Sequence, residues 1–181
     1  MTPALHHYSE TAGIARFEPR PVRVPSPRPP GRDWLNGPLV WAIEAAFAPL
    51  YLFPRDCPRI LLWRTETSGE TDARRWMPDP RARMAAFVEA RWLDRLRSAR
   101  LVRYSLPSDG FEPLDDAGMH VSRTAVMPLG ADAVSDLPAA LAAEGVTLTA
   151  LPDLTPLRGV WDSSLHASGI RLRNAQGWQG A

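Results

Sequence analysis

Short apolar runs, several of them alternating with polar residues, predict many strands along the chain. Runs of about four to eight such residues, bounded by glycine, proline or asparagine, are typical of strands. The run at 39–43, for example, follows the turn-forming residues Asn36-Gly37-Pro38. The predicted strands are residues 5–9, 39–43, 59–64, 101–106, 119–128, 146–151 and 170–173.

Helical periodicity is clearest at residues 84–98. Apolar side chains there recur every three or four positions along one stripe, and arginine, glutamate and aspartate fill much of the rest. A shorter helix is predicted at 136–144, where Ser135 can cap the start, Pro138 fits the first turn and Gly145 ends it. Less regular patterns predict a helix at 44–53 bent by Pro49, a helix at 157–166, and a turn or short helix at 10–17.

Two segments are predicted to be loops. Residues 19–30 contain six prolines and three arginines. Proline fixes φ and removes a backbone donor, so this stretch should be extended. Residues 65–80 are polar and predict a second loop. Since short strands outnumber helices, the chain is predicted to have an α+β fold.

Length and composition favour one globular domain. A chain of 181 residues can bury a core without staples, and 45% hydrophobic and 23% charged residues are ordinary proportions. We therefore predict a single domain over 1–181, with 152–181 as a C-terminal extension. The formal net charge of +1 gives no strong case for nucleic acid or an anionic membrane as a partner.

The usage of basic residues and cysteine narrows the chemistry. All 21 basic residues are arginine, so no lysine can form a Schiff base or act as a P-loop cation. The single cysteine, Cys57, excludes an intramolecular disulfide framework and a multi-cysteine zinc site. No apolar run reaches the roughly 18 residues of a membrane helix, and the first ten residues lack a signal-peptide pattern. A cytoplasmic protein is expected.

Three short stretches contain the candidate functional residues. In the first strand, His7 can donate, accept and titrate near neutral pH, and strand alternation sends His6 to the opposite face. Trp41 in the second strand could carry a stacked nicotinamide or base, although core packing is the ordinary role of such a residue. Acids that follow the strand at 101–106 could stabilise the cationic transition state of ribosyl C–N cleavage, or simply lie in a solvated turn. These acids are Glu112, Asp115 and Asp116.

Other catalytic classes have weaker support. Cys57 lies near two arginines that could lower its pKa and make it a nucleophile, but a small buried residue beside a turn is the simpler interpretation. The histidines lack ligand spacing such as His-x-x-x-His, so no metal site is predicted. The chain contains no P-loop, no Gly-x-Gly-x-x-Gly and no Gly-x-Ser-x-Gly. The four histidines are His6, His7, His120 and His166.

The first two stretches resemble motifs of the ADP-ribosyltransferase fold, and within it the rifampin ADP-ribosyltransferases of bacteria. The family motif Tyr-His-Gly-Thr corresponds to residues 6–9, which places His7 at the NAD-contacting histidine and Tyr8 at the glycine. The second motif is an apolar strand with a tyrosine, followed by a helix with an aromatic residue. It corresponds to the segment from Val40 to Tyr51, with Trp41 at the tyrosine.

The third family region, a strand followed by an acid-rich loop, resembles residues 101–116, and its closing strand resembles 119–126. The resemblance implies two small mixed or antiparallel sheets around a cleft, with flanking helices. It also implies that NAD is a substrate and that ADP-ribose passes to an unknown acceptor with release of nicotinamide. The chain also resembles a small uncharacterised bacterial domain family, which implies no activity.

The resemblance assigns a role to each candidate. His7 would hydrogen-bond the nicotinamide-side ribose and Trp41 would stack on nicotinamide, with Tyr51 as a further NAD contact. Asp115 or Asp116, and less favourably Glu112, would stabilise the cation and help deprotonate the acceptor. Other predicted contacts are with the diphosphate, and their residues are Ser9 and either Arg20 or Arg23.

A second hypothesis is that the chain has the same fold but catalyses no ADP-ribosyl transfer. The tyrosine in place of glycine and the tryptophan in place of tyrosine favour a non-catalytic module that binds a nucleotide or a protein. The oligomeric state is open, because several tryptophans could lie in the core or in an interface. They are Trp34, Trp63, Trp76 and Trp161.

Overall fold

A computed structural model describes residues 3–178, and its contacts divide the chain into two compact units. Unit 1 comprises the residues up to Ala48 together with Leu101–Ala133. Unit 2 comprises Pro49–Arg100 together with the residues from Val134 onward. Each unit has its own sheet, and the chain passes between the units after residues 48, 100 and 133. The prediction of a single domain stays a prediction.

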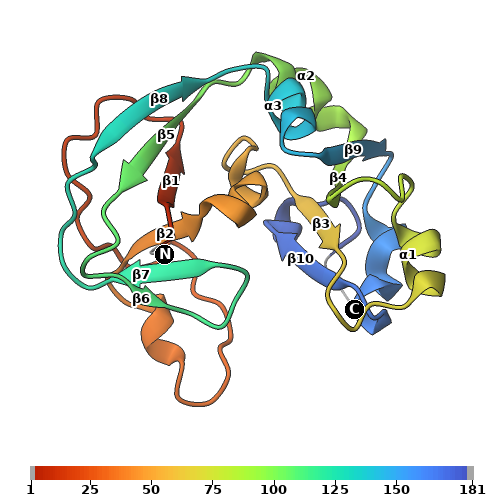
Figure 1. Cartoon of the computed structure of the whole chain (residues 1–181), viewed down its shortest axis with the longest axis horizontal. Coiled ribbons are helices and arrows are strands. Elements are labelled where there is room, and N and C mark those ends of the chain that lie inside the picture. The colour runs from red at the N-terminus through yellow and green to blue at the C-terminus, as the bar shows by residue number, and fades with distance from the viewer. Residues whose placement is uncertain (1–2, 179–181) are drawn as a thin grey trace. The chain divides into compact units, whose positions relative to one another are not determined.

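Unit 1 is built on a six-stranded sheet with the order β6-β7-β2-β1-β5-β8 (Figure 1). β1 pairs antiparallel with both β2 and β5, and β7 pairs antiparallel with β2 and β6. The strands are β1 (Leu5–Ser9), β2 (Val40–Glu44), β5 (Leu101–Leu106), β6 (Glu112–Pro113), β7 (Met119–Ser122) and β8 (Gly130–Val134).

Both faces of this sheet carry apolar clusters. One cluster gathers Tyr104 and Leu106 of β5 with one residue of β1 and two alternate residues of β2, and the loop residues Ile14 and Phe17 pack against it. The residues from β1 and β2 are Leu5, Val40 and Ala42. The opposite face carries a smaller cluster around Val121 and Trp41. Alternation of side chains along β2 explains this division, because neighbouring residues point to opposite faces.

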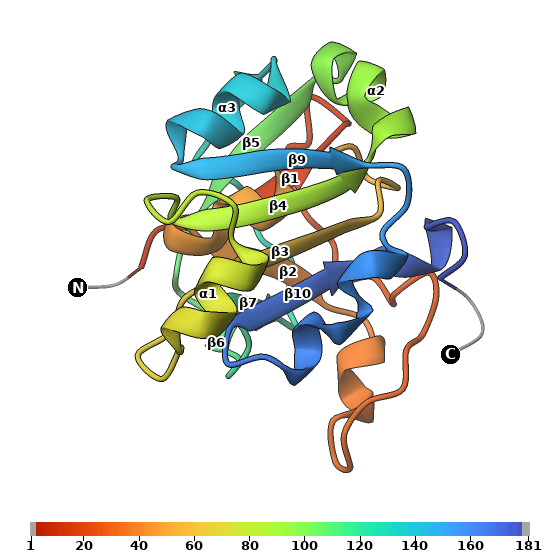
Figure 2. The ribbon, with the colours of Figure 1, turned by 90° about the vertical axis from the view of Figure 1, so that its right-hand side faces the viewer.

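Unit 2 is built on a four-stranded mixed sheet with the order β10-β3-β4-β9 (Figure 2). β3 pairs antiparallel with β4 and β10, whereas β4 pairs parallel with β9. Every residue of β3 and β4 is buried, as expected for central strands covered on both faces. The strands are β3 (Arg59–Trp63), β4 (Met84–Glu89), β9 (Val146–Leu151) and β10 (His166–Ile170).

Short helices cover the sheet of unit 2. Side chains of α1 and η4 join a core cluster with β3 and β4, and α3 lies along β9 next to α2 (Figure 2). Within residues 3–178, no helix is long and apolar enough to span a bilayer. The α-helices are α1 (Glu70–Trp76), α2 (Leu93–Ser98) and α3 (Leu137–Ala143). The 3-10 helices are η1 (Asp33–Asn36), η2 (Ala45–Tyr51), η3 (Ala90–Trp92), η4 (Thr155–Asp162) and η5 (Leu172–Asn174).

The helix predicted at 84–98 is wrong for its first half. Residues 84–89 form β4, and only 90–98 are helical, as η3 followed by α2. Residues 84–88 are apolar at every position, so they satisfy a helical period and a buried strand equally well. Pairing with β3 and β9 decides in favour of the strand.

Several smaller predictions are also corrected. The polar loop at 65–80 contains α1, whose Ala73 packs into the core. The last strand is β10 at 166–170, earlier than predicted, and η4 begins and ends before the helix predicted at 157–166. Residues 10–17 contain no helix. Asp136, not Ser135, caps α3 by accepting a hydrogen bond from the Ala139 N–H at 3.2 Å.

The strand predicted at 119–128 ends at Ser122, and the helix predicted at 44–53 is the 3-10 helix η2. The remaining predicted elements are confirmed to within a few residues. They include the strands at 39–43, 59–64, 101–106 and 146–151, and the extended loop at 19–30. α3 has Pro138 in its first turn and ends at Ala143, and Gly145, two residues later, has a φ of +72°. The α+β class is confirmed, since the chain forms two separate sheets with flanking helices.

Candidate functional site

His7 and Trp41 lie on adjacent strands of unit 1. In the pairing of β1 with β2, Leu5 is opposite Glu44 and His6 is opposite Ile43, and the pairing ends at His6. One residue further on, Nδ1 of His7 lies 2.9 Å from the backbone carbonyl oxygen of Trp41, within hydrogen-bonding distance. The side chain of His7 thus bridges the point where the two strands separate, and it joins two of the predicted stretches.

The side chains of His7 and Trp41 face different surfaces of the sheet. His7 pairs with Tyr104, and its ring centroid lies 4.7 Å from that of Phe17 on the face of the larger apolar cluster. Both neighbours of Trp41 in β2 belong to that cluster, so Trp41 points to the other face, against Val121. The contact between the two stretches therefore runs through the backbone of β2.

The half-buried indole of Trp41 lies beneath Arg28 from the proline-rich loop. The guanidinium carbon of Arg28 is 5.9 Å from the ring centroid, within the range of a cation–π contact. Arg28 Nε also donates to Asn36 Oδ1 at 3.4 Å. The same amide exchanges two hydrogen bonds with the backbone of Ser26, at 3.0 and 3.3 Å. Asn36 therefore holds this part of the loop over the Trp41 face.

Arg123 and Trp34 form a second tryptophan–arginine pair in unit 1. The guanidinium carbon of Arg123 is 4.6 Å from the ring centroid of Trp34, which is 38% exposed. Arg123 also pairs with Glu112, with 3.5 Å between Nη1 and Oε1. Glu112 is in register with Val121, which is in register with Trp41. The side chains of Glu112 and Trp41 thus lie on the same face of the sheet. Two strand spacings separate the residues, which corresponds to about 10 Å between their Cα atoms.

The other two predicted acids lie in the exposed turn after β6. The carboxylate of Asp115 is fully exposed and lies 3.9 Å from Nη2 of Arg32. Asp116 contributes its backbone carbonyl, which accepts a hydrogen bond from the Met119 N–H at 2.8 Å. Of the three predicted acids, Glu112 is the one in register with Trp41.

The remaining predicted contacts are divided between the units. Ser9 Oγ accepts a hydrogen bond from the Thr11 N–H at 3.0 Å. Arg20 exchanges backbone hydrogen bonds with Leu39, directly before β2, which places it at the start of the Trp41 strand. Tyr51 belongs to unit 2, where its ring centroid lies 5.8 Å from the guanidinium carbon of Arg59.

Cys57 is fully buried in unit 2, and its surroundings oppose a nucleophilic thiolate. Burial raises the pKa of the thiol to about 12, although the nearby Arg59 acts in the opposite direction. The thiol donates to the carbonyl of Pro58 at 3.6 Å. Arg59 is itself buried and donates to the carbonyls of Leu50 and Cys57, at 2.8 and 3.0 Å. Cys57 and Arg59 therefore have a structural role, since both bond to backbone carbonyls inside unit 2.

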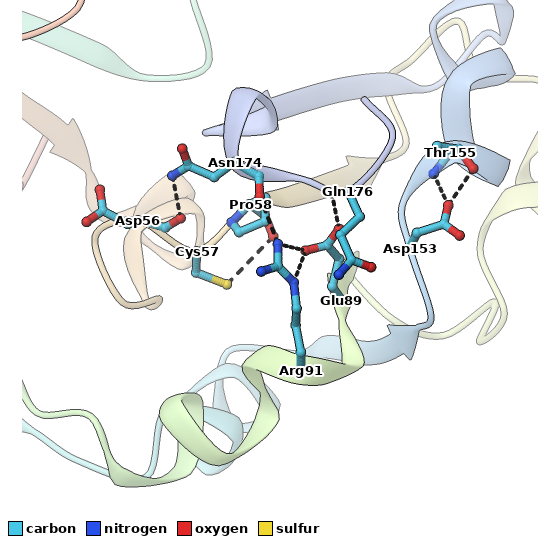
Figure 3. Close-up of polar contacts among 9 residues, drawn as sticks. All are labelled: Asp56, Cys57, Pro58, Glu89, Arg91, Asp153, Thr155, Asn174 and Gln176. Carbon is cyan, nitrogen blue, oxygen red and sulfur yellow. Dashed lines mark hydrogen bonds and ion pairs between the residues drawn. The ribbon is translucent and has the colours of Figure 1, made fainter. Parts of the chain in front are cut away.

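A polar cluster at the end of β4 was missed by the sequence patterns (Figure 3). The carboxylate of Glu89 is fully buried, accepts hydrogen bonds from Arg91 and accepts the Gln176 N–H at 2.6 Å. Arg91 also donates to the carbonyl of Asn174, whose amide donates to the carbonyl of Asp56. The cluster fastens the C-terminal segment to the sheet of unit 2. The erroneous helix at 84–98 concealed it, since a strand ending at Glu89 would have drawn attention to that acid.

The pair His120–Glu44 is a second missed feature, in unit 1. His120 Nε2 lies 2.8 Å from Glu44 Oε1, and the histidine is buried. In unit 2, His166 stacks on Trp63 with 4.2 Å between ring centroids. No group of three or more histidine, cysteine, aspartate or glutamate side chains within residues 3–178 is placed to hold a metal ion.

The comparisons with known proteins identify a family and no activity. Residues 6–175 match the model of a family of unknown function, DUF6886. The match agrees with the resemblance to an uncharacterised domain family. No curated protein and no solved structure matches the chain.

Proposed function

Since the chain belongs to DUF6886, a family of unknown function, we propose from its own residues that unit 1 binds a nucleotide, with NAD as the first candidate. The observation that carries the proposal is the guanidinium of Arg28 over the indole of Trp41, at 5.9 Å. A tryptophan ring can stack on a base or on nicotinamide, and a guanidinium binds phosphate oxygens bidentately. The two groups that a nucleotide requires therefore meet on one surface.

Neighbouring residues supply further groups of the same kind. Arg123 and Trp34 repeat the combination, and Arg32 adds a guanidinium from the end of the loop. Glu112 shares the face of Trp41 and can accept a hydrogen bond from a ribose hydroxyl, as acids do in other dinucleotide sites. With a net charge of only +1, affinity must come from such local contacts.

Calorimetric titration with NAD, ADP-ribose and ATP tests the binding function. Replacing Arg28 with Gln should weaken binding at least about 10-fold, since hydrogen bonds to a charged group contribute roughly 1.5–3 kcal/mol. Arg97→Gln, an exposed arginine of α2 in unit 2, is the matched control and should bind as the wild type does. Absence of binding at millimolar nucleotide, or equal affinity of Arg28→Gln, would reject the proposal.

Transfer of ADP-ribose is the second candidate, and the register that places Glu112 on the Trp41 face favours it, because it brings a carboxylate to the surface that carries the indole. His7 points to the other face, so its contact with the Trp41 carbonyl joins the two stretches that resemble the NAD-binding motifs without placing the imidazole beside the indole. In the reaction, the bond from ribosyl C1′ to the nicotinamide nitrogen breaks, and its electron pair leaves with nicotinamide. An acceptor oxygen or nitrogen bonds to C1′ and loses its proton to a carboxylate. Ser9 and Arg20 remain the candidates for contacts with the diphosphate.

The acid for this step is best sought by comparing Glu112→Gln with the double variant Asp115→Asn/Asp116→Asn. Glu112 shares the Trp41 face, so we expect Glu112→Gln to lose nicotinamide release by at least about 100-fold, as loss of a charge-stabilising group typically does. Nicotinamide release from NAD, with and without candidate acceptors, is the measurement. NAD binding without release would retain the binding function and reject the transferase.

A further inference from the structure

β8 forms an exposed edge of the sheet in unit 1. It is the last strand in the sheet order and lies beside β5 (Figure 1). Its residues from Gly130 to Ala133 are all exposed. An edge strand presents a row of backbone N–H and C=O groups that can pair with another extended chain.

The open side of β8 can be assigned from its hydrogen bonding. The Leu129 N–H donates to the carbonyl of Ser105 in β5 at 2.8 Å. The side chains of Asp132 and Arg103 form an ion pair, so these two residues lie on one face and opposite each other across β8 and β5. The Ser105 carbonyl turns toward β8, and the backbone of Arg103, two residues away, turns the same way. Gly130 and Asp132 consequently turn their backbone groups toward β5, and Ala131 and Ala133 turn theirs to the open side.

The features that usually protect an edge strand are missing here. Residues 129–135 contain no proline and no basic residue. The single charge in this stretch, on Asp132, is bonded to Arg103 of β5 with 3.0 Å between Oδ2 and Nη2. Proline and lysine are the common devices against strand addition. β8 is therefore open to pairing.

Next to this edge lies a hollow of about 420 Å³. Met127 and Leu129 line it and are 69% and 75% exposed, the highest values among the large apolar side chains of the described chain. Asp109, which is also exposed, adds a carboxylate to the lining. Apolar side chains of such exposure beside an open strand are typical of a peptide-binding edge.

We propose that β8 accepts an extended peptide of a partner protein as an added strand. An apolar side chain of the peptide fills the hollow beside Met127 and Leu129, and a basic residue meets Asp109. Main-chain hydrogen bonds to Ala131 and Ala133 provide affinity, while the hollow and the carboxylate provide selectivity. Because the lining of the hollow is both acidic and apolar, we expect the partner strand to carry basic and apolar side chains. This surface is distinct from the face that carries Trp41.

The probe is an acetylated and amidated peptide, Lys-Val-Thr-Val-Thr-Val-Lys, titrated into ¹⁵N-labelled full-length protein. We expect saturable shifts of the amide signals of Ala131 and Ala133. Replacing both lysines of the peptide with glutamate should weaken binding at least about 5-fold, because it opposes Asp109. Asp109→Asn should lose that preference, whereas Asp94→Asn, an exposed acid of unit 2, should keep it.

Two protein variants distinguish strand addition from other ways in which the peptide could bind. Leu129→Ser alters an exposed residue and should weaken binding without loss of fold, and Val24→Ser, at 52% exposure, is its control. Ala131→Pro removes an outward N–H and should abolish binding. Absence of shifts at millimolar peptide, or shifts unaffected by both Ala131→Pro and Leu129→Ser, would overturn the proposal. So would a dimer, lost in Leu129→Ser, that forms without peptide binding, since the surface would then belong to a second copy.

Discussion

The buried carboxylate of Glu89 accepts two hydrogen bonds from the guanidinium of Arg91, two residues further along the chain. Nε and Nη2 of Arg91 lie 2.9 and 2.7 Å from the same oxygen of Glu89. The two partners differ in environment, since the side chain of Glu89 is fully buried and that of Arg91 is 46% exposed. Removing the arginine therefore leaves a charge without water, whereas removing the acid leaves a guanidinium that water can reach.

Arg91→Met should lower the free energy of unfolding by about 3 kcal/mol, because it leaves the carboxylate of Glu89 buried with one hydrogen bond, from the Gln176 N–H. Glu89→Gln should cost only about 1 kcal/mol, since the amide oxygen can still accept that bond. Urea denaturation of both variants measures the difference. Equal losses, or a larger loss for Glu89→Gln, would show that the buried acid does not govern this cluster.

Cys57 should resist alkylation in the folded protein. Its pKa is raised to about 12 by burial, so almost no thiolate forms at pH 8. A raised pKa means that the protonated thiol stabilises the fold fully below the unfolded pKa of about 8.5, and that this contribution is lost as pH rises toward 12. Reaction with iodoacetamide at pH 8, in buffer and in urea, measures this. Equal rates in the two conditions would return Cys57 to the candidate nucleophiles.

Asp72 should make stability depend on acid pH. Its Oδ2 accepts hydrogen bonds from both the backbone N–H and the hydroxyl of Ser164, at 2.7 Å each, and these bonds lower the pKa of the carboxyl. A lowered pKa stabilises the fold above the unfolded value, and the gain is lost as pH falls through the folded value. The melting temperature of Asp72→Asn should therefore be lower than that of the wild type at pH 6, and the gap should narrow as pH falls below the unfolded pKa of about 4.

The control for Asp72 is Asp94→Asn, which changes an exposed acid of α2. Its effect on the melting temperature should be small at every pH, as is usual for surface ion pairs. A gap between Asp72→Asn and the wild type that persists at pH 2 would mean that the loss arises from something other than the charge.

Gly118 and Gly110 have similar φ angles. Substituting each of them therefore separates the cost of a steric clash from the cost of backbone strain. Gly118 has a φ of +68°, and an added Cβ would lie 2.5 Å from Cδ2 of Phe47. Gly110 has a φ of +79°, and its Cβ would meet nothing within 4 Å. Gly110→Ala should cost about 1 kcal/mol from strain alone, and Gly118→Ala about 1–3 kcal/mol more from overpacking. Urea denaturation of both variants provides the comparison, and equal costs would contradict the clash.

Sequence patterns predict an apolar run well when its length and its boundaries decide between helix and strand. The apolar residues 60–63 lie between Arg59 and Arg64, a run too short for a helix, and they match β3. Residues 84–88 fit two periods, and the deciding factor is the partner strand β9, which lies more than fifty residues later. α1 was missed because its apolar contribution to the core is small, chiefly Ala73 and Trp76.

The candidate site was predictable only where it depends on strands. His7 and Trp41 were correctly predicted within strands, and the family resemblance implied that both belong to one site; the two stretches do meet, through the carbonyl of Trp41. The position of Arg28 depends on the hydrogen bonds of Asn36 across a proline-rich loop, and no periodicity encodes such contacts. Glu112 stands out from the neighbouring acids only through the register of β6 with β7.

The division of each unit into two separated stretches of chain affects how the protein can be synthesised and cleaved. When a ribosome has released residues 1–100, β1 still lacks β5 and β4 still lacks β9, so each sheet has only its central pairing, β1 with β2 and β3 with β4. Unit 1 can close once residue 133 has emerged, whereas unit 2 must wait for β10 at 166–170. Fragments that end near residue 100 therefore expose unpaired strand edges from both sheets, and such intermediates depend on chaperones to remain soluble.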